Sequence, residues 1–391
     1  MKEQAKRIED KIIHWRRELH KIPEVGLELP KTSQYIQRQL EKMGVGYRTL
    51  LNGNAIVAIL TGKRKGEGKV FAIRADMDAL PIKEETGLDF ASTNENMHAC
   101  GHDGHAAMLL GAVELLKDKV EDISGTILFL FQPGEEYPGG AKPMIDAGAL
   151  SPMPDAIIGL HAGNLCGEVT GDSIGIGKGA IMASMDRFFI KIVGKGAHGA
   201  SPHQSIDPIS IAAEVISALQ RIVSRELAPT NTAVVSVTRI QGGFNQNIIP
   251  GEVELEGTVR ALDEETRRFI ALRIEEITTH ICAAHRAEAI VEYDDRYPPV
   301  IVDEQITELF AVSAKKIVGE DRIVHIRKPL MGGEDMAFFL REVPGTFFFL
   351  STPGVIDGEV YPHHHPKFDL KENQLWIGSA LFAQMALDFL Q

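Results

Sequence analysis

The sequence predicts an α/β protein in which a mixed-sheet domain is interrupted by a smaller α+β domain. Short apolar runs bounded by glycine alternate with amphipathic helical segments up to residue 184 and again from residue 298. Between them, residues 185–297 follow the order strand-helix-strand-strand-helix-strand, the split βαβ pattern of a compact sandwich. A chain of 391 residues is long enough to form a core in each domain.

The first domain opens with helices and continues with buried strands. Apolar residues at helical spacing between Ile8 and Leu19 predict an amphipathic helix that opens the chain, and it ends before Pro23 because proline biases the preceding residue away from helix. A second helix is expected from Thr32 to Met43. The apolar runs 55–60 and 70–75 are typical of strands that are buried on both faces.

Acidic and imidazole side chains stand where successive strands end. Asp76 and Asp78 follow the second strand, Glu135 and Glu136 follow the strand at 126–131, and His161 ends the strand at 156–161. Ligands at the carboxyl ends of strands are typical of open α/β sheets. Adjacent residues of an extended chain point in opposite directions, so one glutamate is expected to bind metal and the other to move protons. The two aspartates are interpreted as a ligand, as an orienter of a ligand histidine, or as caps of a turn.

The stretch Met97–His105 holds three imidazoles, a thiol and a carboxylate. These groups bind borderline-soft cations such as zinc. Cys100 and His102 are two residues apart and point to one side of an extended segment, and the apolar pattern that follows predicts a buried helix from Asp103 or Gly104. Three successive histidines in the internal loop 363–365 are expected to supply at least one further ligand.

The remaining elements follow from similar patterns. In the inserted domain we expect strands at 187–193, 233–239, 253–262 and 287–293 and helices at 208–224 and 264–284. Its loops at 194–199 and 245–250 are read either as plain turns or as parts of a site. The tail is expected to return to the first domain with helices at 303–318 and 375–390, a helix that starts at 331–335, and a strand at 346–350.

Composition narrows the function classes. The chain is 44% hydrophobic and 24% charged, with a net charge of -13 and no long basic run, which argues against nucleic acid and anionic membranes as partners. No apolar run is long enough to span a bilayer, and no secretory leader is apparent. Three cysteines are too few for a disulfide framework, so a cytoplasmic location is expected.

Several motifs together resemble the aminoacylase and carboxypeptidase family of di-metal exopeptidases, peptidase family M20, and more narrowly its amidohydrolase branch of hippurate hydrolase, auxin-conjugate hydrolases, N-acetyldiaminopimelate deacetylase and aminoacylases. The motifs are Arg74–Pro81, Met97–Asp103, Phe131–Glu136, Gly159–His161, Gly194–His198 and His364–Asp369. The resemblance implies a discontinuous catalytic domain, residues 1–184 and 298–391, and an inserted ferredoxin-like lid or dimerisation domain, residues 185–297. It also implies a homodimer.

The resemblance further implies a set of site residues. Two divalent cations, zinc, manganese, cobalt or nickel, would be held by Cys100, His102, Glu136, His161 and His364, with His365 as the alternative to the last ligand. Glu135 matches the general base. Asp78 matches the aspartate that orients a ligand histidine, and Asp76 matches the position often labelled as the active-site acid.

The implied activity is the hydrolysis of N-acyl amino acids, such as N-acetyl or N-benzoyl compounds, to a carboxylic acid and an amino acid. Glu135 would take a proton from a metal-activated water, and His198 of the other subunit would help to stabilise the oxyanion. Asn247 and Arg260 would hold the substrate carboxylate. Three alternatives are a carboxypeptidase or dipeptidase with the same mechanism, a thiol hydrolase with Cys100 as nucleophile, and a metal-binding relative without turnover.

Overall fold

The computed structural model describes residues 1–66 and 68–391, which divide into two compact units. The first unit comprises Met1–Gly179, Ile301–Lys328 and Asp335–Gln391, and the second comprises Ala180–Val300 and Pro329–Glu334. The chain passes between them near the short strands β7 (Gly179–Met182) and β14 (Val300–Val302). The segment 329–334 belongs to the second unit, although the sequence motifs assigned it to the catalytic domain.

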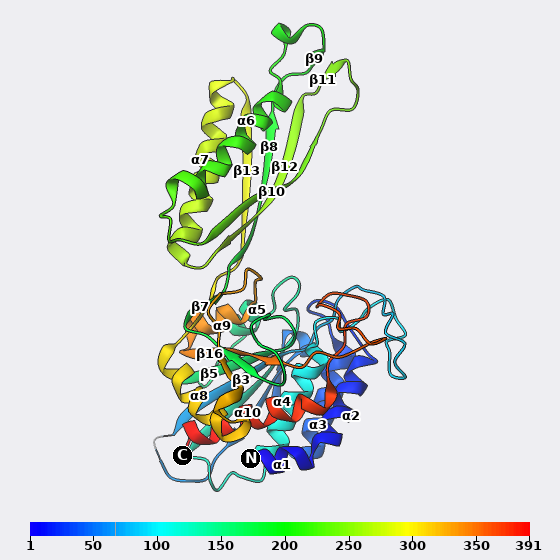
Figure 1. The fold of residues 1–391 in the computed structure, drawn as a ribbon, viewed down its shortest axis with the longest axis vertical. Coiled ribbons are helices and arrows are strands. Elements are labelled where there is room, and N and C mark those ends of the chain that lie inside the picture. Colours follow the sequence, from blue (N-terminus) through cyan, green and yellow to red (C-terminus); the bar gives the residue numbers. More distant parts are fainter. Residues whose placement is uncertain (67) are drawn as a thin grey trace. The chain divides into compact units, whose positions relative to one another are not determined.

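An eight-stranded mixed sheet forms the centre of the first unit (Figure 1). Strands β3, β4, β5 and β16 are mutually parallel, β1 and β2 run antiparallel at one side, and β6 is antiparallel to β16. The strand order is β1 (Gly46–Leu50), β2 (Ala55–Thr61), β4 (Gly125–Gln132), β3 (Lys69–Asp76), β5 (Ala156–Gly163), β16 (Gly345–Ser351), β6 (Ile174–Ile176) and β15 (Ile323–His325). The predicted mixed α/β sheet is therefore confirmed.

Helices cover both faces of this sheet. On one face, α4 (His102–Leu116) packs on β3 and β5 and lies between α2 (Glu9–His20) and α10 (Leu375–Phe389). All residues of α4 except Glu114 are buried, as expected for a helix that is apolar on every side. The opposite face is covered by α9 (Met336–Glu342), since Met336 lies against Gly159 of β5. The unit also contains α1 (Lys2–Arg7), α3 (Pro30–Met43), α5 (Ala141–Asp146) and α8 (Glu304–Val318).

The parallel strands bring the predicted site residues to one edge. The register pairs Asp76 of β3 with Gln132 of β4, and Arg74 of β3 with Gly159 of β5. Asp76, the turn after Gln132 and His161 therefore lie at the same edge of the sheet. Helix α4 begins at this edge.

The second unit is a four-stranded antiparallel sheet with two helices on one face (Figure 1). Its strand order is β10 (Ala233–Gly242), β12 (Glu252–Ala261), β8 (Met185–Val193) and β13 (Glu288–Tyr297), the order of a ferredoxin-like fold. In β12 every second residue is buried beneath α6 (Pro208–Arg221) and α7 (Glu264–Ala284). A small ribbon joins β9 (Ala197–His198) to β11 (Ile248–Ile249). The use of this unit as a lid or dimerisation domain stays a prediction.

No helix in the described residues has the length and apolar character needed to cross a membrane.

Candidate metal centre

Cys100 and His102 stand at the start of α4, as the sequence predicted. Gly101, with φ of +86°, lets the chain turn sharply from the loop into the helix. A side chain at this position would also crowd Leu370, since its Cβ would lie 3.1 Å from that residue. The thiol and the imidazole are both buried.

His102 presents one nitrogen that has no hydrogen-bond partner among the described residues. Its Nδ1 lies 3.2 Å from Asp78 Oδ1, whereas its buried Nε2 is left without a partner. Burial alone would lower the pKa of His102, but Asp76 and Asp78 outweigh it and raise the pKa to about 10. A buried nitrogen of this kind, surrounded by carboxylates, fits a site for a cation.

Asp78 connects the ligand histidine with the acidic turn. Its two carboxylate oxygens accept the backbone N–H groups of Glu135 at 3.0 Å and Glu136 at 3.1 Å. Burial raises the pKa of Asp78, while its hydrogen bond with His102 acts in the opposite direction. Of the two aspartates left open by the sequence, the structure thus brings Asp78 to the Nδ1 side of His102.

Asp76 forms hydrogen bonds with two residues next to the site. It accepts hydrogen bonds from Arg74 Nη1 at 2.7 Å and from His105 Nδ1 at 2.6 Å. His105 Nε2 in turn accepts the backbone N–H of Ala162 at 2.8 Å. Both ring nitrogens of His105 are therefore in use, which leaves it no lone pair for a cation. This role of His105 was not predicted, although the residue lies three positions after His102 and hence on the same side of the helix.

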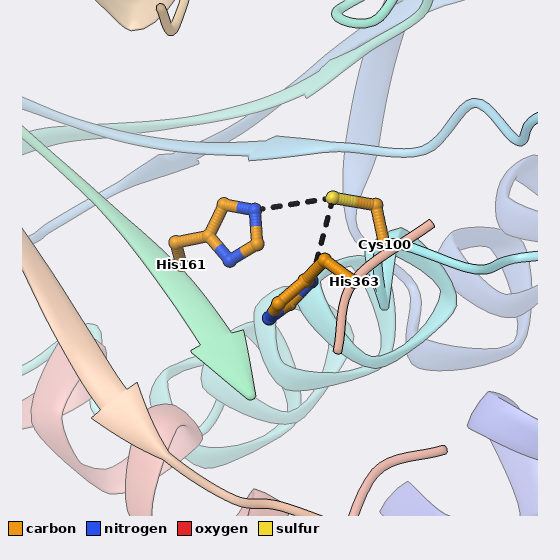
Figure 2. Close-up of side chains that lie close together, drawn as sticks. All are labelled: Cys100, His161 and His363. Carbon is orange, nitrogen blue, oxygen red and sulfur yellow. Dashed lines mark hydrogen bonds between the residues drawn. The ribbon is translucent and has the colours of Figure 1, made fainter. Parts of the chain in front are cut away.

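Cys100 faces two histidines (Figure 2). Its Sγ lies 3.4 Å from His161 Nε2 and 3.6 Å from His363 Nδ1. His161 Nδ1 lies 3.0 Å from the carbonyl oxygen of Ala162 and donates to it, so the lone pair is on Nε2 and points toward the sulfur. Burial lowers the pKa of His161 well below its usual range and that of His363 to about 3. Burial and the nearby carboxylates of Glu136 and Glu135 raise the pKa of the Cys100 thiol.

The histidine next to Cys100 and His161 is thus His363, where the sequence analysis expected His364. His364 lies instead with its Nε2 2.9 Å from Glu136 Oε1, and 51% of its side chain is exposed. The left-handed φ of +66° at His364 explains this division, because it turns successive side chains toward different neighbours. His365, the alternative ligand, stacks on Tyr361.

The two glutamates of the acidic turn both reach the site. One ligand-type atom each from Cys100, His102 and Glu136 lie within 4.8 Å of one another. Burial would raise the pKa of Glu136, but its contacts with His364 and His102 lower it. Glu135 is buried, and its Oε2 lies 4.0 Å from His102 Nε2. Thiol, imidazole and carboxylate donors gathered around an unpartnered nitrogen fit divalent transition metals such as zinc.

The remaining predicted residues lie in the second unit. His198 is exposed on β9, and its Nδ1 accepts the backbone N–H of Ala200 at 3.0 Å, so the ring proton is on Nε2. Asn247 is its neighbour, because the carbonyl oxygen of Asn247 accepts the N–H of Gly199. Arg260 lies on β12 and donates to Thr258 Oγ1 and to the carbonyl oxygen of Val259.

Residues 72–388 match the profile of peptidase family M20/M25/M40. The chain belongs to this family. Among its relatives, an N-acyl-L-amino acid amidohydrolase of Geobacillus stearothermophilus is 46% identical over 306 residues, which cover 77% of this chain and 81% of the relative. Thermostable carboxypeptidase 1 of Saccharolobus solfataricus is 38% identical over 395 residues, which cover 100% and 98% of the two chains.

A solved M20 structure has the same fold. It is the YXEP protein of Bacillus subtilis, described as a dinuclear metal binding peptidase of the M20 family. It superimposes with a TM-score of 0.84 at 35% sequence identity and covers 98% of this chain and 99% of its own. The M20 fold therefore extends over both units of this protein.

Proposed function

We propose that this protein is a metal-dependent amidohydrolase that cleaves N-acyl amino acids. The observation that carries the proposal is the buried, unpartnered Nε2 of His102 beside Cys100 and Glu136, with a second carboxylate, Glu135, next to it. A structural metal site has no use for an additional carboxylate of this kind. The names of amidohydrolase and deacetylase relatives support the same class of reaction.

Five residues are proposed to hold two divalent cations: Cys100, His102, Glu136, His161 and His364. His161, and His102 in its neutral form, each direct one nitrogen lone pair to the site because the other nitrogen hydrogen-bonds to a protein oxygen. His364 is included because its Nε2 meets the carboxylate of Glu136. The description of the YXEP protein as a dinuclear metal binding peptidase supports the number of cations. The donor set suits zinc and leaves room for manganese, cobalt or nickel.

Glu135 is proposed as the general base and acid. Bound cations would polarise the amide carbonyl and supply a water of lowered pKa. Glu135 would take the proton of that water and later return it to the leaving amine. Asp78 holds the backbone N–H of Glu135 and the ring of His102, and thereby fixes the base relative to a ligand.

The second unit is proposed to complete the site from the partner subunit of a homodimer. Because His198 Nδ1 accepts a backbone N–H, its Nε2–H remains a donor for the oxyanion. Asn247 and Arg260 are proposed to bind the substrate carboxylate. Phe244, on the loop before β11, and Ile248 of β11, which pairs with His198, are exposed large apolar residues, which supports coverage by a partner. We also retain the cytoplasm as the proposed location, because all three cysteines are free thiols.

A carboxypeptidase activity is the second candidate, and it is favoured by the name of the Saccharolobus solfataricus relative. A panel of N-acetyl, N-benzoyl and indole-acyl amino acids together with dipeptides separates the two candidates. Higher kcat/KM on the acyl amino acids supports the amidohydrolase, and higher kcat/KM on the peptides supports the carboxypeptidase.

A thiol hydrolase is disfavoured by the state of Cys100. A nucleophilic cysteine needs a lowered pKa, whereas burial and two glutamates raise the pKa of this thiol. Activity that survives exhaustive removal of metal by a chelator would restore this alternative.

The decisive variant for the proposed function is Glu135→Gln. It should lower kcat by a factor on the order of 10²–10⁴, because the amide cannot accept a proton, while two metal ions per subunit are retained. Metal analysis and steady-state kinetics on the same sample measure both quantities. Glu95→Gln, a matched change at an exposed glutamate, should leave both unchanged. Full activity in Glu135→Gln would exclude this residue as the base.

A further inference from the structure

His363 lies against Cys100 but is not one of the five proposed ligands. Its ring rests on Gly163, where a Cβ would lie only 2.6 Å from ring atoms, and it packs against Phe368 with ring centroids 4.5 Å apart. The backbone N–H of Asn164 meets its Nε2 at 3.2 Å. The ring is therefore seated in a cradle that only a glycine at position 163 permits.

The hydrogen bond from Asn164 fixes where the ring proton lies. A backbone amide can only donate, so Nε2 of His363 must present its lone pair to it. A neutral imidazole carries one N–H, which is then on Nδ1. This Nδ1 lies 3.6 Å from Cys100 Sγ, within reach of an N–H···S hydrogen bond (Figure 2). A protonated nitrogen has no lone pair with which to bind a cation.

Two histidines thus approach the same sulfur with opposite polarity. His161 donates its Nδ1–H to the carbonyl oxygen of Ala162 and turns a lone pair toward the site. His363 accepts from a backbone N–H and turns a hydrogen toward the site. The spacing of Cys100, His161 and His363, with ligand-type atoms within 4.8 Å of one another, would by itself also suit three ligands of one ion. The two roles are distinguished by the group that hydrogen-bonds to the ring nitrogen farther from the sulfur. For His161 this group is a carbonyl oxygen, and for His363 it is a backbone N–H.

We propose that His363 is a positioning residue that donates its Nδ1–H to the sulfur of Cys100 and does not bind metal. This inference rests on the proposed metal centre. The hydrogen bond would hold the sulfur in one orientation and offset part of its negative charge when it is a thiolate. His364, the next residue, would remain the ligand, with Glu136 as its neighbour.

The position of the ring proton can be measured directly on the wild-type protein. Long-range ¹H–¹⁵N spectra of histidine side chains distinguish an Nδ1–H ring from an Nε2–H ring, and the His363→Phe variant identifies the signals of His363. We expect the Nδ1–H form in both metal-free and metal-loaded protein. An Nε2–H form in either would overturn the proposal. This readout does not depend on whether metal is bound.

Cobalt substitution tests the effect on the sulfur. His363→Phe keeps an aromatic ring in the cradle and removes the donor. At saturating cobalt it should retain two ions per subunit, with affinity reduced about 10–100-fold, as for other outer-shell partners. Its sulfur-to-cobalt charge-transfer band should move to longer wavelength, because a thiolate without the hydrogen bond gives up charge more easily. The matched control His365→Phe, at a ring that stacks on Tyr361, should leave the band unchanged.

The outcomes separate this inference from the proposed function. Loss of one cobalt ion in His363→Phe, equal to that in His364→Ala, would make His363 a ligand and overturn the proposal. An unchanged band in His363→Phe would also overturn it. A wild-type protein that binds no cobalt would contradict the metal centre itself, whereas the spectra of the histidine ring would still decide the donor role.

Discussion

At the scale of single residues, Asp78 has the largest number of roles in the candidate site. One carboxylate orients His102 and also accepts the N–H groups of Glu135 and Glu136, so a proposed ligand and the proposed base share one anchor. A shift of Asp78 would therefore displace both His102 and Glu135.

The variant Asp78→Asn tests this coupling. The amide has one acceptor oxygen and one NH2 group, so in either orientation it turns a donor toward groups that donate to Asp78: toward Glu136 N–H, or toward His102 Nδ1 and Glu135 N–H. We expect metal affinity to fall roughly 10–100-fold, as for other partners of ligand histidines, and kcat to fall in addition. Isothermal titration of metal-free protein and kinetics at saturating metal measure the two effects. Asp89→Asn, at an exposed aspartate, is the matched control. Wild-type affinity in Asp78→Asn would contradict the role of Asp78.

Residue types and local density predicted much of the site, but side-chain direction could not be read from them. Ligand-type residues that are crowded at strand ends and in the stretch 97–105 indicated where the candidate site lies, and the family resemblance singled out Cys100, His102, Glu136 and His161. The difference between His363 and His364 depends on one left-handed backbone angle. The pattern of three successive histidines contains no information about that angle, so the contact of His363 with Cys100 was not foreseen.

At the scale of elements, α2 and α4 are joined by a buried ionic network beneath the site. Arg16 Nε donates to Asp103 Oδ2 at 2.8 Å, and His20 Nδ1 lies 2.7 Å from the same oxygen. Burial alone would raise the pKa of Asp103, but Arg16 and His20 outweigh it and hold the pKa well below its usual range. Because Asp103 belongs to the first turn of α4, this network fixes the helix end that carries His102.

This network should make the stability of the metal-free protein depend on pH in the acid range. The folded pKa of Asp103 lies below its unfolded value, so the contribution is fully present above about pH 4 and is lost as the pH falls through the folded pKa. Asp103→Asn should lower the free energy of unfolding by about 3 kcal/mol at pH 7, because it leaves a buried pair broken. Below about pH 4, the free energy of unfolding of Asp103→Asn should fall less steeply with decreasing pH than that of the wild type.

Urea unfolding of both proteins in the presence of a chelator measures these differences, with the exposed Asp118→Asn as control. If the free energy of unfolding changed equally steeply with pH in the acid range for the wild type and Asp103→Asn, the assignment of the low pKa to Asp103 would be contradicted.

The long elements were largely predictable, whereas several short ones, among them α5, β6 and β15, were not predicted, and two further differences are instructive. Buried strands such as β4 and β5 are continuous apolar runs, and α4 is an apolar helix. The pattern of apolar residues was therefore sufficient to predict these elements. Strand β1 (Gly46–Leu50) was missed because an edge strand with exposed polar residues lacks that pattern. The break at Ile8, between α1 and α2, was also missed because the apolar spacing continues across it.

At the scale of the whole molecule, we propose that His198 of a partner subunit completes the site. The order of strands in the second unit followed from the sequence, since each element has its own hydrophobic period. The homodimer is implied by the family resemblance alone and stays a prediction, because an exposed residue such as His198 is compatible with a monomer as well as with a dimer.

Mixed dimers test the shared site. His198→Ala and Glu135→Gln should each be nearly inactive as homodimers. A symmetric dimer that shares residues across subunits recovers one intact site in each mixed dimer, so purified mixed dimers should have about one half of wild-type activity and an unfractionated random mixture about one quarter. Activity of tag-purified mixed dimers provides the measurement, and the exposed His203→Ala serves as a control that should stay active throughout. Verified mixed dimers without activity would place His198 outside the partner's site.

The measurement that tests the central claim most directly is anomalous diffraction from crystals of the metal-loaded protein, recorded at the absorption edge of the bound metal. We predict two anomalous peaks about 3.5–4 Å apart, as in other two-metal sites, that lie between Cys100, His102, Glu136, His161 and His364. A single peak, or peaks without contact to Cys100 and Glu136, would contradict the proposed two-metal centre.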